Sequence, residues 1–230
     1  MNLKQSVVDG DWKNQALLFT GCGNPNNASK TSNITIDVKP TNGSINMDPY
    51  VYEDYKGKDF VISMDVRAAK HDGVYNGVNT DLVRVTSFYT PAPSGQTVTY
   101  GESLLRMNGS DYSLSVPAVG NRQVLPLNYQ LSTDRFTNIT VHVHPLKNTY
   151  DIYIDGKQAV KDMLLLSDSS IAKIGTYKNG ELVLSDKANK MEDFCLSYAR
   201  LCNTNGWTIP GDYMLLDNVK MYYSDTIKTN

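Results

Sequence analysis

Alternation of apolar and polar residues with a period of two is the feature that most constrains how this chain can fold. Successive side chains of a strand point to opposite faces, so each alternating run predicts a strand with one buried and one solvated face. Such runs occur at residues 33–38, 60–67, 83–88, 139–144, 150–154 and 213–223. The sequence therefore predicts an all-β protein built from many short strands.

Turn signals separate these runs. Gly follows Asn or Lys at Asn42-Gly43, Lys56-Gly57, Asn76-Gly77, Asn108-Gly109 and Asn179-Gly180. The pair Asp155-Gly156 lies between two apolar–polar runs, and Asp-Gly accepts the positive φ angles of a two-residue type I′ turn. We expect a tight antiparallel hairpin there, and antiparallel pairing through most of the fold.

One segment departs from the strand period. From Ala188 to Cys202, apolar residues recur every three or four positions, which is the spacing of an amphipathic helix. Ser185 or Asp186 can cap its start, and Asn203 to Gly206 can end it. We predict one short helical insertion over residues 188–202.

The three cysteines, Cys22, Cys195 and Cys202, are too few and too irregularly spaced for a disulfide framework or a common zinc site. Buried or incidental thiols fit the sequence, and so does one disulfide with one free thiol. In a helix the Cα atoms of Cys195 and Cys202 would lie ~10 Å apart, whereas a disulfide needs less than about 7 Å. The only disulfide then possible is one between Cys22 and either Cys195 or Cys202.

Composition narrows the class of protein. The chain has 230 residues, 40% of them hydrophobic, and a formal net charge of -2. No basic face for non-specific nucleic-acid binding is expected from that balance, and no apolar run is as long as the ~20 residues of a membrane span. We expect one domain over residues 1–230, with a poorly patterned segment at 1–30. No signal peptide follows Met1, so we expect this domain to belong to a larger exported protein.

Two motifs carry a resemblance to a known fold family. Phe136 to Leu166 contains Thr149-Tyr150-Asp151-Ile152-Tyr153-Ile154-Asp155-Gly156-Lys157 and resembles the central hairpin of laminin-G-like and other concanavalin-A-like domains. The last run, Tyr213 to Tyr222, is similar to the closing strand of bacterial members. The resemblance implies a concanavalin-A-like antiparallel β-sandwich, or jelly roll. Galactose-binding-like jelly rolls close in a similar way, so only the hairpin favours the concanavalin-A type.

The resembled fold family includes enzymes that act on sugars, but this sequence contains only parts of their catalytic motifs. Glucanases of this fold carry a Glu-x-Asp-x-Glu strand, and no such triplet occurs here. Lys173 to Tyr177 is similar to the late "K-A-G-x-Y" strand of jelly-roll alginate lyases, which would make Tyr177 the acid or base. Their early "R-x-E-x-R" strand would fall at residues 63–67, where only Arg67 agrees. No His stands between residues 82 and 107, where their middle motif belongs.

Polar residues that alternate with apolar ones are the candidate binding residues. These are Asp65, Arg67, Arg84, Thr86, His142, His144 and Tyr153. If several share the concave sheet, they form a polar groove for a sugar; otherwise they coat a solvated sheet face. We select Arg84, His142, Tyr153, Tyr177 and Trp207 as carbohydrate-binding candidates. Trp207, in a turn-rich loop from Asn203 to Gly211, is either a platform for a sugar ring or a plug over the sandwich end.

Asp217 in the closing strand is a candidate ligand for a structural calcium ion, together with oxygens of the N-terminal segment. The alternative is an Asp bonded to backbone amides.

The favoured function is a non-catalytic carbohydrate-binding module that binds a polysaccharide or glycan on the concave sheet face, outside the cell. The alternatives are a polysaccharide lyase centred on Arg84, Lys173 and Tyr177, and a structural or adhesion domain without a sugar ligand.

Overall fold

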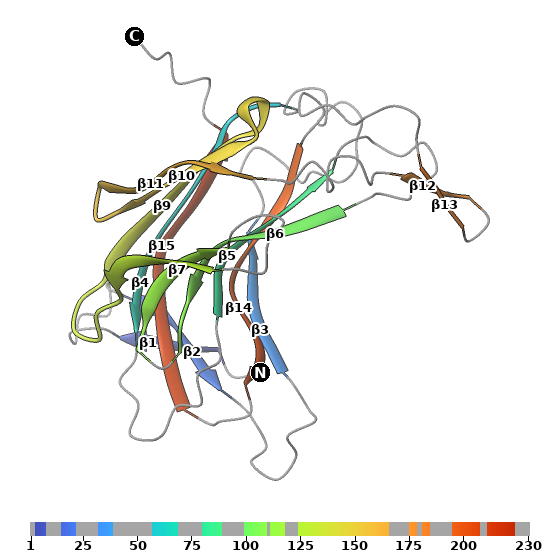
Figure 1. Cartoon of the computed structure of the whole chain (residues 1–230). Helices are drawn as coiled ribbons and strands as arrows, with labels where there is room; N and C mark the ends of the chain where they lie inside the picture. Colours follow the sequence, from blue (N-terminus) through green and yellow to red (C-terminus); the bar gives the residue numbers. More distant parts are fainter. Residues whose placement is uncertain are drawn as a thin grey trace.

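The computed structural model describes the backbone of residues 3–7, 15–21, 32–38, 57–68, 80–88, 99–109, 111–117, 124–165, 175–178, 181–184, 195–207 and 211–223. Side chains are described for residues 57–68, 80–85, 102–109, 111–117, 124–165, 201 and 214–223. Two large antiparallel sheets and a small hairpin make up these residues (Figure 1).

The first sheet, called sheet A here, has seven strands. In spatial order they are β1 (Leu3–Val7), β2 (Gln15–Gly21), β15 (Gly211–Tyr223), β4 (Phe60–Ala68), β9 (Thr137–His144), β10 (Thr149–Ile154) and β11 (Lys157–Leu164). Chain-distant strands are therefore neighbours: β15 lies between β2 and β4, and β4 pairs with β9.

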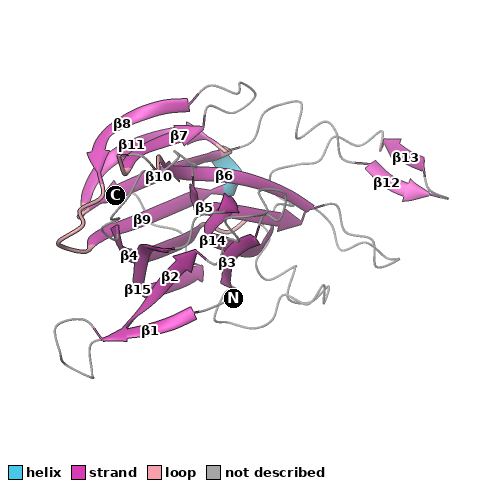
Figure 2. Cartoon of the chain, turned by 90° about the horizontal axis from the view of Figure 1, so that it is seen from below, coloured by secondary structure: helices cyan, strands magenta, loops and turns pink. Residues whose placement is uncertain are grey.

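The second sheet, sheet B, has six strands. In spatial order they are β3 (Ser32–Val38), β14 (Cys195–Trp207), β5 (Thr80–Phe88), β6 (Thr99–Met107), β7 (Ser113–Pro117) and β8 (Val124–Gln130). The remaining strands, β12 (Gly175–Lys178) and β13 (Glu181–Leu184), pair only with each other in a separate hairpin. Figures 1 and 2 both show this hairpin standing away from the two sheets.

A single apolar core joins the two sheets. Sheet A contributes the alternate residues of β4, β9 and β10, and sheet B contributes apolar residues of β5, β6 and β7. Tyr150 of β10 is fully buried, and its hydroxyl donates a hydrogen bond to the carbonyl oxygen of Leu104 in β6 over 3.2 Å. Burial, reinforced by the negative charge of Glu102, raises the pKa of Tyr150 far above its ordinary value, so this phenol stays a donor.

The expected β10–β11 hairpin forms at Asp155-Gly156. Both residues have positive φ, 48° and 75°, as a type I′ turn requires. The backbone N–H of Asp155 donates to the carbonyl of Asn138, while its carboxylate accepts the Asn138 N–H and the Arg135 guanidinium, each over 2.9 Å. The turn is therefore held against the start of β9.

A bulge interrupts the closing strand. Apolar residues of β15 fall at 214, 216, 219 and 221, a spacing that skips one step of the strand period. The register shifts between Asp217 and Lys220, and Asn218 has a φ of 49°. One extra residue in the strand thus keeps Met214, Leu216 and Met221 on the core side.

The helical insertion predicted for residues 188–202 is wrong from Cys195 onward, because residues 195–207 form strand β14. Residues 188–194 lie outside the described part of the chain. Among the described residues the helical structure is the 3-10 turn Pro145–Lys147. Strand β14 is bonded on both sides, to β3 and to β5, and this paired central position outweighs a weak three–four periodicity.

The change from helix to strand affects the cysteines and Trp207. At about 3.3 Å per residue, Cys195 and Cys202 lie ~23 Å apart along β14, so they still cannot pair with each other. Cys22 lies outside the described residues. The loop expected at 203–211 is wrong in its first part, because Trp207 ends β14 opposite Ser32 of β3. Register shifts on either side of Thr204 accommodate the turn-type residues within that strand.

In the part of the chain that the structure describes, no helix is long and apolar enough to cross a membrane.

Replacing Gly156 by Ala tests the hairpin turn. A Cβ added at Gly156 would meet no heavy atom within 4 Å, so the cost is purely the backbone strain of an L-residue at positive φ. We expect Gly156→Ala to lower the free energy of unfolding by about 1–2 kcal/mol, measured by urea denaturation. Gly156→Asn should lose less, because Asn tolerates left-handed backbone. Equal stability of all three proteins would show that the turn conformation is not strained.

Candidate functional site: the polar face of sheet A

The outward face of sheet A carries a row of polar side chains across its central strands. Along these strands the polar positions alternate with buried ones, as His142 does with Val141 and Val143. The members that bear on function are Asp59 before β4; Ser63, Asp65 and Arg67 of β4; Asn138, Thr140, His142 and His144 of β9; and Asp151 and Tyr153 of β10. We call this set the polar face.

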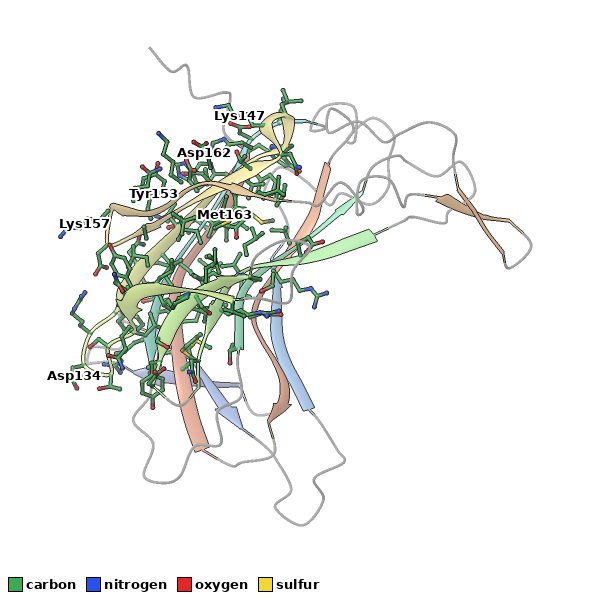
Figure 3. The ribbon with its side chains drawn as sticks, viewed as in Figure 1. Asp134, Lys147, Tyr153, Lys157, Asp162 and Met163 are labelled. Atoms are coloured by element: carbon green, nitrogen blue, oxygen red, sulfur yellow. The ribbon has the colours of Figure 1, made fainter. Side chains whose placement is uncertain are left out.

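Two predicted site residues, His142 and Tyr153, meet at the centre of the polar face. Their ring centroids lie 5.1 Å apart with the planes at 47°. The side-chain amide of Gln158 in β11 donates to the Tyr153 hydroxyl over 3.4 Å. Figure 3 shows Tyr153 on the outer side of the β10–β11 hairpin, whereas Met163 lies toward the space between the sheets. The pair presents partly exposed ring surface beside hydrogen-bonding groups.

His144 lies between two carboxylates beside this pair. Its Nδ1 is 2.8 Å from Asp59 Oδ2, and its Nε2 is 3.5 Å from Asp151 Oδ2. The other oxygen of Asp151 accepts the backbone N–H of Asp162 over 2.7 Å. These side chains are only 12%, 22% and 13% exposed for His144, Asp59 and Asp151. The arrangement fixes His144 in place and sets two carboxylates next to His142 and Tyr153.

Local electrostatics favour the uncharged forms of the central pair. Burial, helped by the charge of His144, lowers the pKa of His142 against the opposing pull of Asp151 and Asp59. Burial, helped by Asp151, raises the pKa of Tyr153. At neutral pH the pair is therefore a neutral imidazole against a neutral phenol, and both groups can donate and accept hydrogen bonds.

A second group of hydrogen bonds fills the next rows of the polar face. The Ser63 and Thr140 hydroxyls are 3.1 Å apart, and Thr140 donates to Asn138 over 3.1 Å. Both oxygens of Asp65 accept amide hydrogens, from Asn138 at 2.7 Å and from Asn218 at 2.6 Å. Thr140 pairs with Tyr153 in register, so this group is continuous with the aromatic pair.

Arg67 lies at one end of the polar face. Its guanidinium carbon lies 5.3 Å from the centre of the Phe136 ring, a cation–π distance. Its Nε is buried without a hydrogen-bond partner. Arg67 therefore packs against the sheet.

Arg84 does not join this site. It lies in β5 of sheet B, on the other side of the core, opposite Ser103 of β6. Its positive charge partly offsets the effect of burial, which raises the pKa of Glu102. Nearby, Asp81 accepts hydrogen bonds from Ser103 over 2.7 Å and from Arg106 over 2.8 Å. Sheet B thus has a polar set of its own, and one groove cannot hold Arg84 together with His142.

The other two carbohydrate-binding candidates stand in other elements. Tyr177 lies in β12 of the small hairpin, Trp207 at the end of β14, and their side chains are outside the described set. Lys173 lies outside the described residues. The three residues expected for a lyase are therefore spread over a separate hairpin, sheet B and a segment that is not described.

The calcium candidate Asp217 accepts the backbone N–H of Asn218 over 2.7 Å. In register it stands opposite Asp65, whose oxygens are both occupied by amides. No group of three His, Cys, Asp or Glu side chains suited to a metal occurs among the described residues. The side chains of the N-terminal segment, the expected co-ligands, lie outside that set, so the calcium site stays a prediction.

Sequence reasoning missed Asp59 and Asp151 as part of the site. Asp151 alternates with Tyr150 and Ile152, so the strand period does place it on the polar face with Tyr153. Asp59 has no local signal, because it reaches His144 across 85 residues of chain through the pairing of β4 with β9.

Comparison with solved structures identifies the fold class. No family model and no curated protein matches the chain. The endo-β-1,4-glucuronan lyase of the fungus Trichoderma reesei is similar in structure, with a TM-score of 0.54 and 10% identity over 97% of this chain and 87% of that one. Alginate lyase AlyC3 (TM-score 0.48, 10% identity, 92% of this chain and 76% of that one) and the cellulose-induced protein Cip1 (0.44, 12%, 96% and 84%) are more distant. At this identity the likeness shows fold alone, and the predicted antiparallel jelly-roll sandwich is confirmed.

The lowered pKa of His142 predicts a pH dependence of stability. In the unfolded chain this imidazole binds a proton near its ordinary pKa of about 6.5, whereas the folded protein resists protonation. The contribution is therefore fully present above that pH and is lost as the pH falls through it. Melting temperatures between pH ~7.5 and ~5.5 should fall more for wild type than for His142→Gln. Parallel curves for the two proteins would contradict the assignment.

Proposed function

We propose that this protein is a carbohydrate-binding module and that the polar face of sheet A is its glycan-binding surface. The observation that carries the proposal is the His142–Tyr153 pair, 5.1 Å apart and partly exposed in a field of amides, hydroxyls and carboxylates. A pyranose ring has apolar C–H faces and an equatorial rim of hydroxyls. An aromatic surface beside planar hydrogen-bonding groups matches both.

The fold supports this reading as a scaffold. One of its structural neighbours is named as a lyase that acts on glucuronan, a polysaccharide. A fold hosts many functions, so the likeness directs attention to glycans without assigning an activity. A rigid, hydrogen-bonded sheet suits binding because its side chains are ordered before the ligand arrives.

The polar face favours binding over catalysis. A lyase needs a base, an acid and a group that neutralises the substrate carboxylate, held around one sugar. Of the residues expected for that role, Arg84 lies in sheet B and Tyr177 in the separate β12–β13 hairpin, and Lys173 lies outside the described residues. We further propose that the protein is part of a larger chain and works outside the cell, where it binds extracellular polysaccharide.

Truncation of Tyr153 tests the binding surface. Tyr153→Ala should weaken glycan binding by roughly 1–3 kcal/mol, the usual scale for an aromatic hot spot. Tyr153→Phe keeps the ring and loses the hydroxyl bonded to Gln158, so its loss should be smaller. The measurement is affinity on a glycan array followed by calorimetry with the best ligand.

Leu146→Ala is the matched control, because Leu146 is 60% exposed in the turn beyond β9. It should bind as wild type does. A Tyr153→Ala protein that binds normally but melts far lower would show that Tyr153 serves packing. An array without any bound glycan would favour the structural or adhesion alternative, and unsaturated uronate released from a polymer would favour the lyase.

Calcium binding near Asp217 remains part of the proposal. An ion that binds only the folded state stabilises it by mass action. Excess chelator should therefore lower the melting temperature of wild type but leave Asp217→Ala unaffected. Identical melting curves of wild type with calcium and with chelator would remove the ion from the proposal.

A further inference from the structure

The charge around the His142–Tyr153 pair is one-sided. The charged groups acting on the pair are Asp151, Asp59 and His144. Asp151 stands directly opposite His142 in register and is two residues from Tyr153 on the same strand. Two carboxylates against a single imidazole leave net negative charge whether or not His144 carries a proton.

The cations that could balance a ligand carboxylate are distant in register, packed against a ring or exposed to solvent. Lys220 shares a cross-strand row with Tyr153, through Ser63 and Thr140, so three strand spacings separate them, or ~14 Å. Arg67 is packed on Phe136 at the end of the polar face. Lys157 and Lys161 are exposed on the edge strand β11, where solvent and salt screen them more than the nearly buried Asp151.

We propose that the polar face binds glycans that lack carboxylate and sulfate groups, and that Asp151 is the specificity-determining residue that excludes uronic acids. This inference rests on the proposed function of the same surface. A uronate seated on the His142–Tyr153 pair would place its carboxylate beside Asp151, and a like-charge contact of this kind is strongly unfavourable. Neutral hydroxyls carry no charge to be repelled, and they find donors and acceptors in the amides, hydroxyls and phenol of the polar face.

The test compares sugars of equal length and different charge. Calorimetry with the full chain would use neutral cello- and manno-hexasaccharides against hexameric oligoglucuronate and oligomannuronate. The neutral sugars should bind at least about tenfold more tightly in dilute buffer, and the gap should narrow in ~1 M salt as repulsion is screened.

The variant Asp151→Asn tests the effect of the Asp151 charge on specificity. It keeps a planar polar group but removes the charge, so the ratio of uronate affinity to neutral-sugar affinity should rise roughly five- to fiftyfold. Asp59→Asn, at the other side of His144, serves if Asp151→Asn is unstable and should raise the same ratio. Asp134→Asn is the matched control, since Asp134 is an exposed acid distant from Tyr153 (Figure 3), and it should leave the ratio unchanged.

The outcomes separate the two proposals. Uronates that bind as tightly as neutral sugars, or an unchanged ratio in both Asn variants, would overturn this inference and leave the glycan-binding function standing. Failure of every hexasaccharide to bind would overturn the proposed function itself.

Discussion

The structure depends on the packing of two sheets against one apolar core. Strand alternation puts one set of side chains of β4, β9 and β10 into that core, and removing apolar area from water supplies most of the stability. Tyr150 extends across the core and donates to a backbone carbonyl of the opposite sheet, so its polar end is satisfied where water is excluded. Because the core fixes one face of each strand, it also fixes the opposite face, and the polar face of sheet A is the outward counterpart of the same packing.

That coupling explains why the candidate site is rigid. His142 is flanked by the buried Val141 and Val143, so this part of β9 cannot turn without moving core residues. Cross-strand partners then complete the surface: Asp151 for His142, Thr140 for Tyr153 and Asn138 for Asp65. The side chains are held by neighbours on three strands, which is the kind of preorganisation that lowers the entropic cost of binding a flexible glycan.

Sequence reasoning succeeded where the signal was local and repeated. The runs at 33–38, 60–67, 83–88, 139–144, 150–154 and 213–223 all lie in strands, and Asp155-Gly156 forms the expected turn because its two residue types tolerate positive φ. It failed at residues 195–202, where a three–four spacing predicts a helix but pairing with β3 and β5 imposes a strand. Local periodicity carries little weight when a segment occupies a central place in a sheet and pairs with a neighbouring strand on each side.

The sequence by itself determined the fold class, the strands and which residues of each strand are polar, because strand geometry relates neighbours in the chain. Only the tertiary structure decided which of those residues meet. It joined His142 with Tyr153, placed Asp59 against His144 across 85 residues of chain, and put Arg84 on the far side of the core. Sheet order is set by contacts between segments far apart in sequence, and alternation is the same whichever sheet a strand enters. A period of two therefore specifies which side chains share one face of a strand. Which residues of other strands they contact on that face depends on the packing of the whole chain.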